Sequence, residues 1–171
     1  MDHGPLAQAA PERPRMQANE PTALSYLARR GVAAQWRGFL RALVETLDAH
    51  LDATSRDSLL RTVGTRLGAN QPLPPCGSLA ELEARMNEVL AAADWGWADI
   101  ALDPNDRMLV ITHCAAPAVA TGADPGGSWI GAVLEGLYGA WLGAQPGAEP
   151  SLVPRRAGTQ PGMITFRYGR G

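Results

Sequence analysis

The chain has 171 residues, a length that suits one domain with a modest terminal extension. Its formal net charge is −2, which argues against sequence-independent binding of nucleic acid through a clustered positive surface. The two cysteines, Cys76 and Cys114, are too few for the disulfide framework of a small secreted domain. The start lacks a signal peptide and no apolar run approaches the roughly 20 residues of a membrane span, so we expect a cytoplasmic protein that does not cross the membrane.

The chain opens with a proline-rich segment. Its first 22 residues include Pro5, Pro11, Pro14 and Pro21 and carry few apolar side chains to bury. We therefore predict that residues 1–34 form a mobile extension, within which residues 22–30 could make a short helix. Residues 35–171 are predicted to form one domain.

A long amphipathic helix is predicted from Ala34 to Leu51. Its large apolar side chains recur at steps of three and four residues: Trp36, Phe39, Leu40, Leu43, Val44, Leu47 and Leu51. Because burial of each is worth about 1.5–3 kcal/mol, we expect a core to cover this stripe.

Two further helices are expected before the first strand. One spans Ser55–Leu67 and ends near Gly68. The other begins at Ser78, where Ser78 and Glu81 have the spacing of a capping box, and continues to Leu90. Between the two helices, the prolines of residues 71–77 exclude helical structure.

The apolar periodicity then changes to that of strands. Trp97–Leu102 and Met108–Thr112 alternate around an Asp-Pro-Asn-Asp turn, which predicts a β-hairpin. A loop rich in glycine and proline over 115–127 leads to a fourth helix, Trp129–Leu142.

The end of the chain predicts a second hairpin. Its strands are expected over Leu152–Arg156 and Met163–Tyr168, with a turn through residues 158–162. Because hairpins pair antiparallel strands, the expected fold class is α+β. N-terminal helices precede a small antiparallel sheet of about four strands, and one helix is inserted between the two hairpins.

The helix predicted over residues 129–142 is apolar on nearly all sides and contains three glycines, each costing up to about 1 kcal/mol relative to alanine. It could be the centre of its own subunit, or it could also pack against another subunit through its small residues. The candidate oligomer-interface residues are Trp129, Ala132, Gly136, Gly139, Ala140 and Gly143. Glu135, its one charged residue, is expected to pair with an arginine or to face solvent. The tryptophans are expected to pack in the core.

Known catalytic and cofactor motifs do not stand out. Residues 122–128 lack the Gly-Lys-Ser/Thr end of a phosphate-binding loop. His113 and Cys114 are neighbours on a predicted strand, so they point to opposite faces and cannot share a metal ion. Asp103 and Asp106 could act as paired carboxylates, but they flank a turn, where local hydrogen bonding explains them. We predict no enzyme activity, cofactor or metal.

Two segments carry a resemblance to a known family. Residues 128–132, the run VLEGLYG at 133–139, Trp141 and QPGA at 145–148 resemble the signature of the BcsD family of bacterial cellulose synthase. Pro74-Pro75-Cys76 and Asp94-Trp95-Gly96-Trp97 have that family's order and spacing. The similarity runs from about residue 35 to 170, and the extension before it cannot be matched.

The resemblance implies a non-catalytic accessory scaffold of the cellulose synthase complex. Members form dimers that assemble into a ring-like octamer, which organises the export of nascent glucan chains into crystalline cellulose. Expected partners are further copies, other synthase subunits, a proline-rich accessory protein and nascent glucan chains, on the cytoplasmic side of the inner membrane rather than in the periplasm. The extension could alter or fill the ring or dock a partner, and the glucan-contacting residues are unknown.

A function of another class fits the same size, acidity and α+β pattern. A small acidic dimer could act as a chaperone-like protein that binds an extended polypeptide. The mass of the assembly separates the two hypotheses, because the scaffold predicts about eight subunits and the chaperone predicts two.

Overall fold

A computed structural model describes residues 20–170 of the chain. Its helices are α1 Glu20–Arg30, α2 Ala34–His50, α3 Ala53–Asn70, α4 Leu79–Ala92 and α5 Ile130–Gly143. Its strands are β1 Trp97–Leu102, β2 Leu109–Cys114, β3 Arg155–Gln160 and β4 Met163–Tyr168. The α+β class is confirmed, with α5 inserted between the two hairpins as expected.

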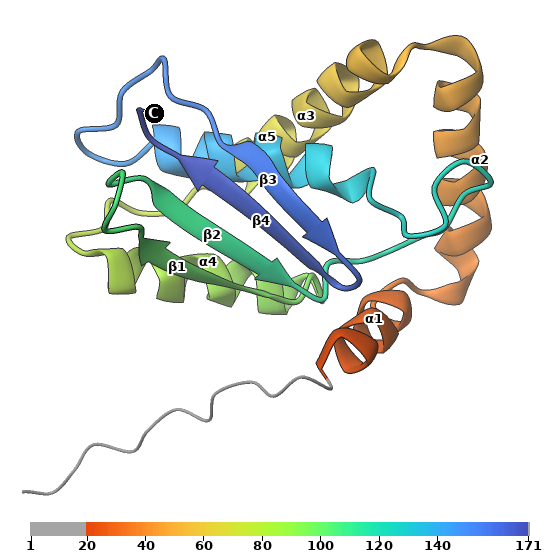
Figure 1. The fold of residues 1–171 in the computed structure, drawn as a ribbon, viewed down its shortest axis with the longest axis horizontal. Coiled ribbons are helices and arrows are strands. Elements are labelled where there is room, and N and C mark those ends of the chain that lie inside the picture. Colours follow the sequence, from red (N-terminus) through yellow and green to blue (C-terminus); the bar gives the residue numbers. More distant parts are fainter. Residues whose placement is uncertain (1–19, 171) are drawn as a thin grey trace, which may run out of the picture.

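The four strands form one antiparallel sheet in the order β1-β2-β4-β3. Figure 1 shows α4 and α5 behind the sheet, while α2 stands away from this body and meets α3 at a corner. Alternate strand residues face the helices, among them Ile100, Ile111, Ile164 and Phe166, which are all buried. The core therefore lies between the sheet and the helix layer.

The last hairpin differs from the prediction. Strand β3 begins at Arg155 rather than Leu152 and continues to Gln160, through the residues expected to form the turn. The turn is Pro161-Gly162, in which Gly162 adopts a positive φ of 74° that suits glycine. Pro154 has no N–H to donate to a strand ladder, which explains the later start. Gly158 is in the strand, next to a bulge.

Side-chain caps define the starts of α3 and α4. Asp52 accepts the Ser55 N–H at 2.9 Å, so α3 begins earlier than the predicted Ser55. Ser78 Oγ accepts the Glu81 N–H at 3.1 Å, as the predicted capping box requires. The Glu81 carboxylate, however, accepts the Gly77 N–H at 2.8 Å.

Helices α3 and α5 pack with almost no space between their backbones. A Cβ on Gly64 would lie 1.8 Å from the Val133 carbonyl oxygen, and a Cβ on Gly136 would lie 1.9 Å from that of Arg61. Only glycine fits such a contact. Helix α5 is buried along most of its length, so the interpretation that it is the centre of its own subunit is confirmed.

Candidate functional site

The six candidate interface residues of α5 occupy two different environments. Trp129 and Ala132 are buried in the subunit, and Gly136 lies against α3. Gly139, Ala140 and Gly143 line an open groove of about 720 Å³, bounded by α3, α5 and residues 149–156. Whether any of the six contacts a second copy stays a prediction.

The ion pair predicted for Glu135 is confirmed. Arg61 Nε of α3 donates to Glu135 Oε2 at 2.6 Å, and the backbone N–H of Arg156 on β3 donates to Oε1 at 2.9 Å. The Glu135 side chain is 7% exposed, and both oxygens have partners. This carboxylate therefore joins α5 to α3 and to β3.

Sequence analysis missed a second set of ionic contacts at the corner between α2 and α3. Arg56 of α3 pairs with Asp48 of α2 at 2.7 Å and with its neighbour Asp57 at 2.8 Å. Asp57 also pairs with Arg156 of β3 at 3.3 Å. These contacts hold the corner relative to the sheet, and no motif in the sequence indicates them.

An apolar surface runs along α2 and the facing part of α3. It consists of Trp36, Phe39, Leu43, Leu59 and Val63, which we call the arm face, and each is between 43% and 58% exposed. The rings of Trp36 and Phe39 pack edge to face, with their centroids 5.8 Å apart. Trp36 and Val63 also border a hollow of about 350 Å³. Contiguous apolar surface of this kind commonly marks an interaction site.

The expectation that a core covers the whole α2 stripe is wrong. Val44 is buried and Leu40 is half-buried, but Trp36, Phe39 and Leu43 are exposed. The expectation that the tryptophans pack in the core fails at Trp36 for the same reason. The loop before α5 bonds to Arg41 and Glu45 of α2, but within residues 20–170 this packing leaves Trp36, Phe39 and Leu43 exposed.

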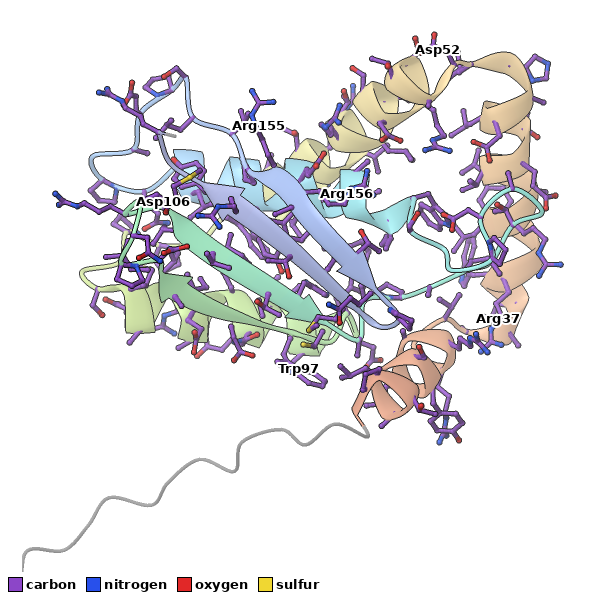
Figure 2. The ribbon with its side chains drawn as sticks, in the orientation of Figure 1. Arg37, Asp52, Trp97, Asp106, Arg155 and Arg156 are labelled. Carbon is purple, nitrogen blue, oxygen red and sulfur yellow. The ribbon has the colours of Figure 1, made fainter. Side chains whose placement is uncertain are left out.

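Asp103 and Asp106 of the first hairpin form hydrogen bonds within its turn, as predicted. Asp103 accepts the Asn105 N–H at 3.0 Å, and Asp106 accepts the Met108 N–H at 3.1 Å. Arg167 of β4 pairs with both aspartates, and Figure 2 shows Asp106 beside this hairpin. The Asn105 N–H and then Arg167 lower the pKa of Asp103. Residues 20–170 contain no group of three side chains suited to a metal ion.

His113 and Cys114 point to opposite faces of β2, as predicted. His113 Nδ1 lies in hydrogen-bond contact with the Tyr138 hydroxyl, and Nε2 lies 2.8 Å from the Trp95 carbonyl oxygen. Cys114 packs with Leu24 on the other side. Burial lowers the pKa of His113 to about 4, because a charged ring would lose its hydration. Its neutral ring joins β2, α5 and the turn after α4.

Comparisons with known proteins agree on one family. The family model for the D-subunit of cellulose synthase matches residues 22–169. Cellulose synthase operon protein D of Komagataeibacter xylinus is 37% identical over 118 residues, covering 69% of this chain and 76% of that protein. The protein of the same name from Komagataeibacter sucrofermentans is 36% identical over the same shares. The chain belongs to the cellulose synthase D-subunit family, BcsD.

In this BcsD-family protein the family match begins at residue 22, whereas the motifs indicated a similarity from about residue 35. Residues 22–30 lie in α1, whose Leu24 and Ala28 are buried against the body. The division into an extension of residues 1–34 and a domain of 35–171 stays a prediction, and residues 1–19 lie outside the described part. No helix among the described residues is long and apolar enough to span a membrane.

Proposed function

We propose that this BcsD-family protein is a non-catalytic accessory scaffold for cellulose synthesis that works as a homo-oligomer. The observation that carries the proposal is the arm face. A monomer would leave five large apolar side chains of α2 and α3 about half in water. Burying the exposed part of each would gain on the order of 1 kcal/mol.

A second copy of the chain is the occupant that we propose for the arm face. Helix α2 and its corner with α3 lie apart from the sheet (Figure 1), so a second copy could approach them with its own sheet at a distance. A two-fold interface uses the same patch on both protomers, and an apolar patch matches itself. The alternative partner is a polar polysaccharide chain, which offers little apolar surface against which the aliphatic side chains of Leu43, Leu59 and Val63 could be buried.

The proposed octamer, its partners and its location are inferred from membership of the BcsD family. Dimers would assemble into a ring-like octamer that holds nascent glucan chains apart until they coalesce. Other synthase subunits and a proline-rich accessory protein would anchor the ring at the cytoplasmic face of the inner membrane. The chain has two cysteines in 171 residues, a usage that suits a reducing compartment better than that of a small secreted domain. The arginine partners of Glu135, Asp103 and Asp106 support a role without catalysis.

The test is the mass of the purified protein by light scattering on a sizing column. The wild type should run near eight times the 18.1 kDa of one chain. The double variant Trp36→Glu and Phe39→Glu should dissociate into smaller species, because charge in an apolar interface is costly. Leu102→Glu is the matched control, since Leu102 is 55% exposed on the β1 hairpin away from the arm face.

Two results would count against the proposal. A monomeric wild type, or a double variant with the mass of the wild type, would remove the arm face as an interface. A stable dimer that the double variant leaves intact would instead favour the chaperone-like protein that binds an extended polypeptide.

A further inference from the structure

The two edge strands of the sheet, β1 and β3, differ in how many of their outward backbone groups have hydrogen-bond partners. At the β1 edge, the Asn87 side chain of α4 bonds both backbone groups of Ala98, with its Nδ2 donating to the carbonyl and its Oδ1 accepting the N–H, each at 2.8 Å. Glu83 accepts the Ile100 N–H at 2.7 Å. Helix α4 thus closes this edge against pairing with another chain.

The β3 edge is open over residues 157–160, beyond Arg156, whose N–H bonds to Glu135. The two-residue Pro161-Gly162 turn makes Gln160 and Met163 a hydrogen-bonded pair, so the next pair along is not bonded and Thr159 directs its N–H and carbonyl away from β4. Among the described residues, no side chain bonds the backbone of residues 157–160. These residues are exposed and include Ala157 and Gly158, which offer no steric block.

The groove described above adjoins the start of this edge. Gly139 and Gly143 contribute to its wall. A Cβ on Gly143 would meet nothing within 4 Å, so the helix leaves space there for a side chain of another segment. Arg61 and Arg155 also line it. Figure 2 shows Arg155 at the start of β3.

Both of these arginines have unused hydrogen-bond donors. Arg61 holds Glu135 through Nε, and its terminal amino groups have no partner among the described residues. Arg155 has no ion pair or side-chain hydrogen bond within that same part of the chain. The acidic residues of the groove are already engaged, Glu135 as described and Glu149 by Arg170 at 2.5 Å. The groove therefore offers two guanidinium groups to an incoming carboxylate.

We propose that the β3 edge and the adjoining groove bind an extended, acidic segment of a partner protein. The segment would add a strand beside β3 through backbone hydrogen bonds, and its carboxylates would meet Arg155 and Arg61. Strand addition needs backbone N–H and carbonyl groups in the ligand and the arginines need anions, and a neutral glucan has neither. The site goes beyond the proposed scaffold function, which requires no peptide ligand.

The test uses the full-length assembly and a fluorescein-labelled heptapeptide of alternating threonine and glutamate, with a threonine–lysine peptide as the control ligand. Fluorescence anisotropy at low salt should show binding of the acidic peptide alone. Arg155→Glu should weaken it by about tenfold or more through charge reversal. Thr159→Pro should weaken it similarly by removing an outward donor.

Arg85→Glu is the matched control for charge. Arg85 is an exposed residue of α4, the helix that packs on the opposite edge, and it pairs with Glu88 at 2.9 Å. This variant should bind the acidic peptide like the wild type. Where Thr159→Pro does not fold, as judged by circular dichroism, slowed hydrogen exchange at residues 157–160 of the wild type with peptide bound tests the same edge.

Three results would overturn the site. They are equal binding of the acidic and basic peptides, equal binding by Arg155→Glu and the wild type, and a Thr159→Pro variant that changes the mass of the assembly but not peptide binding. The last would assign the edge to a second copy of the chain. The scaffold proposal is tested separately, since Arg155→Glu should leave the mass unchanged.

Discussion

Replacing Gly136 with alanine should destabilise the protein, because the new methyl group has no space. Its carbon would lie 1.9 Å from the Arg61 carbonyl oxygen and 2.8 Å from the Thr65 nitrogen, whereas a relaxed contact needs more than about 3 Å. Both are backbone atoms of α3 and cannot rotate away. Helices α3 and α5 would have to separate by about an ångström or more, on the order of the distance that loses much of the dispersion energy of a contact.

The magnitude follows from two opposing effects. Overpacking a close-packed interior costs about 1–3 kcal/mol or somewhat more, and alanine in a helix gains up to about 1 kcal/mol over glycine. The contact with rigid backbone puts Gly136→Ala near the upper end of the cost, so we expect a net loss of about 2–3 kcal/mol in the free energy of unfolding.

Urea denaturation followed by circular dichroism, at one protein concentration, measures this loss. Gly38→Ala is the matched control, since a Cβ on Gly38 in α2 meets nothing within 4 Å. That variant should gain about 0.5–1 kcal/mol through helix propensity alone. A Gly136→Ala protein as stable as the wild type would refute the close packing of α3 on α5.

Three further predictions use the same denaturation assay. Glu135→Gln should cost about 1–3 kcal/mol, because it weakens two hydrogen bonds to a buried carboxylate, while Glu88→Gln in an exposed pair should change stability by less than about 1 kcal/mol. Burial lowers the pKa of His113 in the folded state to about 4, below its usual 6.5. Its contribution to the free energy of unfolding is therefore present above pH 6.5 and is lost as the pH falls toward 4. The loss is about 3 kcal/mol, and a His113→Gln variant with the same pH dependence would contradict it. Ser78→Ala should cost about 1 kcal/mol by removing the cap of α4.

Local patterns in the chain were enough to predict most of the elements. Helices α2, α4 and α5 and the first hairpin follow from periodicity, a capping pair and an Asp-Pro-Asn-Asp turn, all of which act over a few residues. Strand β3 was placed less well, because the turn predicted through residues 158–162 is confined to Pro161-Gly162 and residues 158–160 continue the strand.

The candidate site was only partly predictable. The small residues of α5 indicated close packing, and the structure assigns Gly136 to a contact within one chain. That Glu135 needs an arginine could be expected from its apolar surroundings. Its partner Arg61 lies 74 positions away in the sequence, and no local pattern connects the two.

The sequence by itself determined which segments are helices and strands, which faces are apolar and which family the motifs resemble. Only the tertiary structure decided what covers each face, because burial depends on where distant segments pack. The α2 stripe shows the difference, since its period predicts an apolar face equally well whether a core or solvent lies beside Trp36 and Phe39. The open β3 edge and its arginine groove arise in the same way, from contacts between segments that are far apart along the chain.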